Sequence, residues 1–153
     1  MGKIARMVIF RDARREDVPS IVALLADDML GASRETALDD AYWAAFDQIA
    51  ADAKNRLIVA EVDGQIAGTM QLTLLPGLSR HGMLRAQIEA VRVAAGQRGQ
   101  GLGRAMIEWA IEQARAHGCG LVQLTSDKRR SDAIRFYEAM GFTASHEGLK
   151  LPL

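Results

Sequence analysis

The sequence has a single cysteine, Cys119, and no net charge. One cysteine excludes an intrachain disulfide and any zinc site built from several cysteines, and it suits a protein of the reducing cytoplasm. Nineteen Lys and Arg residues balance nineteen Asp and Glu residues, which argues against a protein that mainly coats nucleic acid or an anionic membrane. The three histidines are far apart and show no metal-ligand spacing. We therefore expect a cytoplasmic protein with no metal and no nucleic-acid or membrane partner.

Long apolar runs are also missing. The longest, such as Ile21 to Ala26, have six residues, whereas a membrane-spanning helix needs roughly 20. Residues 1–6 lack the apolar core of a signal peptide. The length of 153 residues, without repeats or low-complexity tracts, predicts one domain over residues 1–153 that needs no disulfide or metal to fold.

Hydrophobic spacing and turn residues predict alternating strands and helices. Strands are expected over residues 7–11, 57–62, 65–75, 87–93 and 121–125, and from Phe142 onward. Helices are expected from residues 15–17 to Met29 with a stop at Gly31, and over residues 35–54, 102–118 and 131–140, the last capped by Ser131-Asp132. Asp63-Gly64 predicts a tight hairpin turn, and residues 78–85 a loop. The order is β-α-α-β-β-β-α-β-α-β, which indicates an α/β domain.

A glycine-rich turn over residues 96–103 leaves one predicted strand and enters a predicted helix. Four glycines in eight residues let backbone amides converge on a phosphate at a helix N-terminus. The turn lacks the Gly-Lys-Ser/Thr of a P-loop, and its glycines fail the Gly-x-Gly-x-x-Gly spacing of a dinucleotide site. Arg98, Gly101 and Gly103 instead fit the pattern Arg-x-x-Gly-x-Gly.

This pattern resembles the acyl-CoA pyrophosphate loop of the GNAT superfamily of N-acyltransferases. Residues 88–93 resemble the family's fourth strand, and residues 133–142 resemble its helix and turn A-x-x-F-Y-x-x-x-G-F. The order of elements is also the family's order. The resemblance implies a mixed, mostly antiparallel central sheet with flanking helices, and transfer of an acetyl group from acetyl-CoA to a primary amine by direct transfer in a ternary complex.

The resemblance also implies roles for particular residues. Glu89 is the candidate base, because a primary amine is mostly protonated at neutral pH and Glu89 lies in an otherwise apolar strand, where we expect it to be partly buried. The alternative role of Glu89 is a surface salt bridge on the strand. Tyr137 matches the family's general acid for the leaving thiolate, with packing against Phe136 and Phe142 as the alternative role. The expected acetyl-CoA contacts are Val91, Arg92, Val93, Arg98, Gly99, Gln100, Gly101, Leu102, Gly103, Arg104 and Arg130.

Several points stay open. Arg130 stands where many relatives have Asn, so it either meets a phosphate or starts a solvated helix. A noncatalytic acyl-CoA sensor is the alternative function, and a nucleotide-binding enzyme is disfavoured by the failed spacings. The acceptor is a small-molecule or peptide amine, and a homodimer is possible within the family. Residues 27–63 carry nine acidic and three basic side chains, which indicates either a solvated acidic helix pair or a preference for cationic amines.

Overall fold

The computed structural model describes residues 7–28 and 30–153. It divides into two compact units, residues 1–123 and 124–153. Two parts of the sequence predictions lie outside the described residues. They are the lack of a signal peptide in residues 1–6 and the end of the first helix at Met29. In the part that is described, no helix is long and apolar enough to cross a membrane.

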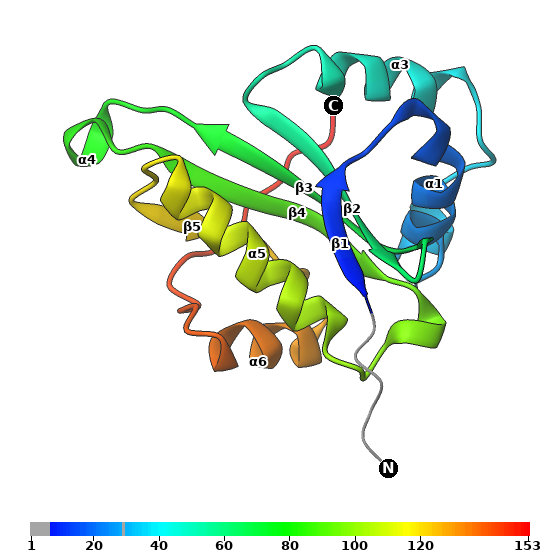
Figure 1. The fold of residues 1–153 in the computed structure, drawn as a ribbon. Helices are drawn as coiled ribbons and strands as arrows, with labels where there is room; N and C mark the ends of the chain where they lie inside the picture. The colour runs from blue at the N-terminus through cyan, green and yellow to red at the C-terminus, as the bar shows by residue number, and fades with distance from the viewer. Residues whose placement is uncertain (1–6, 29) are drawn as a thin grey trace. The chain divides into compact units, whose positions relative to one another are not determined.

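The first unit is built on a five-stranded sheet with the spatial order β1-β2-β3-β4-β5 (Figure 1). The first four strands pair as antiparallel neighbours, and β5 pairs parallel to β4. This mixed, mostly antiparallel sheet confirms the expected fold class. The strands are β1 (Val8–Asp12), β2 (Asn55–Val62), β3 (Gln65–Leu75), β4 (Arg85–Val93) and β5 (Leu121–Gln123).

The hairpin between β2 and β3 is confirmed. Val62 pairs with Gln65 across a two-residue turn, and Asp63 and Gly64 both have positive φ, at 51° and 80°. Turns of this kind match the right-handed twist of the strands that they join. The dipeptide therefore fixes the register of the central strand pair.

Helices cover both faces of this sheet. On one face, α1 (Val18–Ala26) contacts β3 and β4, and α3 (Asp40–Ala50) contacts β2. On the other face, α5 (Leu102–Ala116) contacts β3, β4 and β5. The short elements are η1 (Arg15–Asp17), α2 (Gly31–Arg34), α4 (Ser79–Gly82) and η2 (Ala95–Gln97).

The tightest part of the core lies between the sheet and α5. Strand residues Ile58, Met70 and Ile88 and helix residues Met106 and Ile107 are all at most 2% exposed. The pattern follows from alternation along the strands, because Ile58 pairs with Met70, and both point to the face that α5 covers. Burying these branched and flexible side chains supplies the main apolar stabilisation of this unit.

Several predicted boundaries in this unit were wrong. The second helix runs over Asp40–Ala50 rather than residues 35–54, because the Asp39 carboxylate accepts a hydrogen bond from the Ala41 amide at 2.9 Å and caps it. Gly31 begins the short α2 instead of ending α1. The expected loop over residues 78–85 contains the single turn α4, and β4 starts already at Arg85.

The second unit contains α6 (Ser131–Ala139) and no strand. The residue before the helix is Arg130, and no side chain caps the helix start, so the expected Ser131-Asp132 cap is wrong. The strand expected from Phe142 onward is also wrong, since residues 142–153 have no regular structure. A strand needs a neighbour for its backbone groups, and the residues after α6 find none in their own unit.

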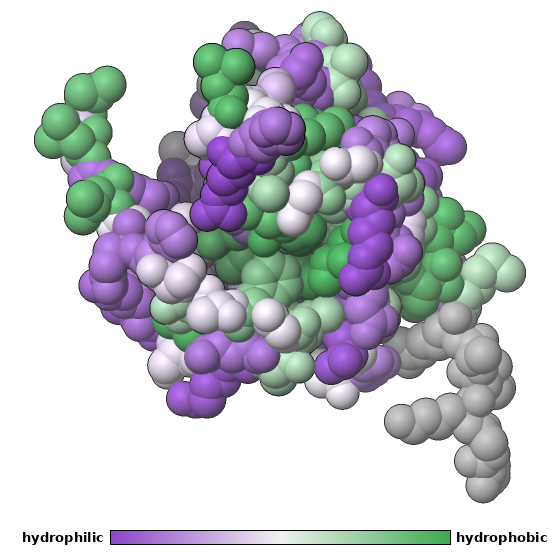
Figure 2. Space-filling view, turned by 90° about the vertical axis from the view of Figure 1, so that its left-hand side faces the viewer, coloured by the Kyte–Doolittle hydropathy of each residue, from purple (hydrophilic) through white to green (hydrophobic). Residues whose placement is uncertain are grey.

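Hydrophilic and hydrophobic side chains are mixed on the surface (Figure 2). On the face that Figure 2 displays, hydrophilic and hydrophobic residues alternate, and hydrophilic groups cover much of it. Such a mixed surface is ordinary for a globular protein of zero net charge.

Candidate active site

The strands β4 and β5 pair over only three residues each. Arg85, Ala86 and Gln87 pair with Leu121, Val122 and Gln123, and β5 ends there. The strand β4 continues for six more residues, and in the described part of the chain no strand pairs with that edge. Backbone groups on an open edge need water or a ligand as partners. The edge of residues 88–93 can therefore accept an extended, amide-containing molecule as an added strand.

A β-bulge interrupts β4 at the same place. Gln71 pairs with Glu89 and Thr69 pairs with Arg92, so two residues of β4 oppose the single residue Met70. Ala90, the first of the two, has a left-handed φ of 51°. That conformation costs an L-residue on the order of 1 kcal/mol, and such outliers cluster at functional sites. The bulge directs Glu89, Ala90 and Arg92 toward the face that α1 and α3 cover.

Glu89 lies at the end of a row of polar side chains on this face. Its carboxylate accepts a hydrogen bond from the Gln87 side-chain amide at 3.2 Å, and Gln87 accepts one from Gln123 at 2.9 Å. Glu89 is exposed, so the expected partial burial is wrong. β5 ends at Gln123, opposite Gln87, so no strand of the first unit pairs beside Glu89 on that edge. An exposed carboxylate can take a proton directly or through water.

The glycine-rich turn has the geometry of an anion site. Gly99 and Gly101 have positive φ, at 76° and 86°, and a Cβ at either would point into open space. Gly101 is the residue before α5, and the first turn of that helix contains no acidic residue. The first bond within the helix runs from the Ala105 amide to the Gly101 carbonyl, so the amides of residues 102–104 have no partner in the helix ladder. The turn therefore fits a pyrophosphate.

The charged side chains of the turn are engaged with protein groups. Arg98 donates to the Val93 carbonyl at 3.2 Å and to the Asp27 carbonyl at 3.0 Å. Arg104 pairs with Glu108 on the surface of α5 at 2.9 Å. The Gln100 side chain donates to the Gly96 carbonyl at 3.2 Å. These contacts hold the shape of the turn, and the predicted roles of Arg98, Gln100 and Arg104 in binding acetyl-CoA stay predictions.

A half-buried ion pair joins β4 to the end of α1. The Arg92 Nε lies 2.7 Å from the Asp28 carboxylate, and both side chains are 12% exposed. The other oxygen of Asp28 accepts a hydrogen bond from the Gly31 amide at the start of α2. Arg92 thus fixes the connection between α1 and α2 to the strand that carries Glu89. The sequence singled out Arg92 but gave no reason to choose Asp28 among nine acidic residues in residues 27–63.

A second ionic cluster lies at the start of α1. The Arg11 guanidinium donates to the carboxylates of Asp17, at 2.7 Å, and Glu61, at 2.7 Å. The hydrogen bond from Arg11, together with one from the Arg14 amide, lowers the pKa of the buried Asp17. The cluster ties β1 and β2 to the start of α1.

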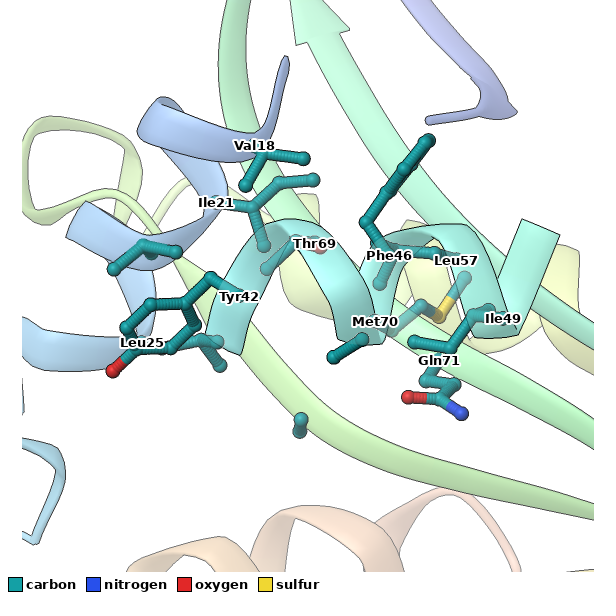
Figure 3. A pocket seen from close by; sticks show the side chains of 13 residues that line it. Val18, Ile21, Leu25, Tyr42, Phe46, Ile49, Leu57, Thr69, Met70 and Gln71 are labelled. Carbon is teal, nitrogen blue, oxygen red and sulfur yellow. The ribbon is translucent and has the colours of Figure 1, made fainter. Parts of the chain in front are cut away.

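A small apolar cavity lies between α1, α3 and the sheet (Figure 3). Its volume is about 130 Å³, and the bulge residue Ala90 borders it. Nothing in the sequence indicated this unfilled space. The side chains that line it are those of Val18, Ile21, Val22, Leu25, Tyr42, Ala45, Phe46, Ile49, Leu57, Thr69, Met70, Gln71 and Ala90.

The remaining predicted residues belong to the second unit. Tyr137 lies on α6 and makes edge-to-face contacts with Phe136 and Phe142, at centroid distances of 5.1 and 5.7 Å. Arg130 precedes α6, and its amide donates to the Asp127 carbonyl at 2.9 Å. Their roles in catalysis and in cofactor binding stay predictions. Across residues 7–28 and 30–153, no group of three His, Cys, Asp or Glu residues could hold a metal.

Comparisons with known proteins agree with this geometry. Residues 18–142 match the family model described as Acetyltransferase (GNAT) family. The chain is 31% identical over 136 residues to the aminoalkylphosphonate N-acetyltransferase of Salmonella typhimurium, covering 89% of this chain and 85% of that protein. A crystal structure of a transcriptional regulator from Bacillus halodurans C-125 superposes with a TM-score of 0.93 at 47% identity, covering 96% of this chain and all of that one. An acetyltransferase from Trypanosoma brucei gives a TM-score of 0.79 at 28% identity, with coverage of 96% and 100%.

Proposed function

Because the chain belongs to the GNAT acetyltransferase family, we propose that it moves an acetyl group from acetyl-CoA to a primary amine by direct transfer in a ternary complex. The open edge of β4 beyond Gln87 is the observation that carries the proposal. It leaves residues 88–93 without a strand partner on that edge, beside an exposed carboxylate and a turn suited to phosphate. The family match extends from residue 18 to residue 142, which supports one N-acetyltransferase domain over residues 1–153.

The chain's own groups suit the parts of acetyl-CoA. The amides around Gly99 to Gly103 hold the pyrophosphate, because glycines with positive φ let them converge and the helix N-terminus adds partial positive charge. Val91 and Val93 can offer backbone groups to the pantetheine arm, although their carbonyls accept hydrogen bonds from the Arg92 and Arg98 side chains, at 3.0 and 3.2 Å, which the arm would have to displace. Arg104 is exposed and extends toward solvent, where it can meet a further phosphate. When bound, acetyl-CoA supplies the activated acyl group.

Glu89 takes the proton from the amine. An ammonium group cannot attack a carbonyl carbon, so the carboxylate must accept a proton as the new amide bond forms. The hydrogen bond from Gln87 orients this carboxylate. Tyr137 donates a hydrogen bond to the departing thiolate, a role that rests on its place in the family's motif.

The proposal is tested by the release of free thiol from acetyl-CoA over a panel of primary amines. Glu89→Gln is expected to lower kcat at pH 7 by about 10²-fold, with part of the loss recovered at high pH, where the amine is deprotonated. Glu112→Gln, on the surface of α5 and paired with Arg115, is the matched control and is expected to keep full activity. An unchanged kcat in Glu89→Gln would remove that residue from the role of base.

Tyr137→Phe tests the acid separately. The variant keeps the ring contacts with Phe136 and Phe142 and deletes only the hydroxyl group. We expect a lower kcat with an unchanged KM for acetyl-CoA. Normal turnover would show that Tyr137 serves packing alone.

A noncatalytic acyl-CoA sensor is the second candidate function. The observation that favours it is the similarity to a Bacillus halodurans protein described as a transcriptional regulator. A sensor would gain thermal stability from acetyl-CoA but release no thiol with any amine. Whether it is an enzyme or a sensor, we place the protein in the reducing cytoplasm, because it has a single cysteine.

A further inference from the structure

The cavity between α1, α3 and the sheet is walled almost wholly by apolar side chains, and among residues 7–28 and 30–153 no Asp, Glu, Lys or Arg lines it. Figure 3 shows side chains from both helices and from the strands converging on it. The helix α3 has an apolar stripe of Tyr42, Phe46 and Ile49, yet none of its residues is fully buried. The stripe therefore faces unfilled space as well as neighbouring side chains.

The few polar atoms at the cavity wall already have protein partners. The Thr69 hydroxyl donates to the Ile58 carbonyl at 2.9 Å. The Tyr42 hydroxyl donates to the Glu35 carboxylate at 3.2 Å, and the Gln71 side-chain amide donates to Asn55 at 3.1 Å. A charged or strongly polar group placed here would lose its water without gaining a partner, which is costly.

The size of the cavity limits its occupant. An apolar cavity of about 150 Å³ in a protein core can hold benzene, and this one has about 130 Å³. It therefore suits a branched alkyl or aromatic group of about five or six carbon atoms.

The position of the cavity connects it to the proposed chemistry. Gln71 and Ala90 border it. Glu89 is the cross-strand partner of Gln71 and the chain neighbour of Ala90. An amine whose apolar group fills the cavity can thus present its nitrogen at the carboxylate that we assign as the base.

We propose that the acceptor is a primary amine with a compact apolar body, which the cavity between α1 and α3 binds. This inference rests on the proposed function. It differs from a preference for polyamines, because none of the acidic residues that the structure describes lines the cavity, and four of the nine in residues 27–63 already pair with arginines: Asp27 with Arg98, Asp28 with Arg92, Asp47 with Arg15 and Glu61 with Arg11. It also differs from the aminoalkylphosphonate named for the Salmonella relative, whose anionic group would find no partner in this cavity.

The experiment fills the cavity from α3. Ala45 and its neighbour Ala44 are both exposed, but Ala45 lines the cavity and Ala44 does not. Thiol release would be measured for wild type, Ala45→Leu and Ala44→Leu with 3-methylbutylamine, putrescine and 2-aminoethylphosphonate. Wild type is expected to prefer 3-methylbutylamine in kcat/KM by at least about tenfold, since apolar groups in a fitted pocket discriminate by roughly 10–200-fold. Ala45→Leu should lose most of that preference with an unchanged KM for acetyl-CoA, and Ala44→Leu should keep it.

The outcomes separate this inference from the proposed function. Efficient acetylation of putrescine or 2-aminoethylphosphonate that Ala45→Leu leaves intact would overturn the apolar acceptor and leave the enzyme standing. If no amine leads to thiol release, the shift in Tm on adding 3-methylbutylamine shows whether the cavity binds an apolar amine. A rise in Tm for wild type and Ala44→Leu but not for Ala45→Leu supports an apolar amine site on a protein without turnover. No rise in any variant would overturn the inference.

Discussion

The two faces of the central sheet are covered in different ways. Against α5, strand and helix side chains such as Ile58, Met106 and Ile107 are completely buried. Against α1 and α3, ion pairs such as Arg11–Asp17 and Arg92–Asp28 tie the helices to the strands, and α3 buries no residue fully. The second face is well packed where α1 buries Val18, Ile21 and Val22, but α3 leaves open space there, on the side of the sheet that carries the exposed Glu89. The difference gives four predictions, taken from the largest effect to the smallest.

Removing bulk from the α5 face should have the largest effect. Ile107→Ala leaves a cavity in a fully buried position and is expected to lower the free energy of unfolding by about 2–5 kcal/mol. Denaturant unfolding at neutral pH measures the change. A loss below about 1 kcal/mol would mean that this face is no better packed than the other.

Adding bulk to the same face should cost less. A Cβ at Gly68 would lie 2.8 Å from the Met106 sulfur and 3.2 Å from the Arg92 carbonyl oxygen. The Met106 side chain can move, so Gly68→Ala is expected to destabilise the protein by about 1–3 kcal/mol. Gly77→Ala, where a Cβ meets nothing within 4 Å, is the matched control and should unfold like wild type. Equal stability of the two variants would contradict tight packing at Gly68.

Acid should act on the ion-paired face. The pKa of Asp17 is lowered in the folded protein by the hydrogen bond from Arg11, so the unfolded chain binds the proton more readily. The stabilisation from this carboxylate is present above the unfolded pKa of about 4 and is lost as the pH falls through the folded pKa.

The test compares wild type with Asp17→Asn by chemical unfolding between pH 7 and pH 2.5. Wild type should be more stable at pH 7, and the gap should shrink in acid, by at most about 1.4 kcal/mol per pH unit. A gap that stays constant over the whole range would show that Asp17 is not ion-paired in solution.

Removing bulk from α3 should have the smallest effect. Ile49 is half-buried and already borders open space, so Ile49→Ala is expected to cost about 1 kcal/mol or less. Denaturant unfolding of Ile49→Ala and Ile107→Ala compares the same substitution on α3 and on α5, and so compares how tightly the two helices pack. Equal losses in both variants would mean that α3 packs as tightly as α5.

Much of the fold could be predicted because local signals agree with it. Asp63-Gly64 sets its hairpin through its own backbone preference, and the amphipathic stripe of residues 102–116 is long enough to define a helix. The element from Phe142 onward could not be predicted, since an apolar run becomes a strand only where a partner pairs with it.

The site was predicted in part for the same reason. The glycine spacing of residues 96–103 is local, and the structure gives that turn the backbone of an anion site. Asp28 was missed because its pairing with Arg92 depends on contact between residues 64 positions apart in the chain. The exposure of Glu89 was missed because the pairing of β4 with β5 stops at Gln87, and no pattern within either strand encodes where that pairing stops.

The bulge at Ala90 changes which residues of β4 face each side of the sheet. Before it, odd-numbered residues such as Gln87 and Glu89 face α1 and α3, and after it the even-numbered Arg92 does so. A single extra residue thus lets one strand present a carboxylate and, three positions later, a cation to the same side, which simple alternation forbids. Deleting one residue here would turn Arg92 toward α5 and separate the strand from the connection between α1 and α2. The extra residue therefore places Glu89 before the bulge and Arg92, which anchors the connection between α1 and α2, after it on the same side of the sheet.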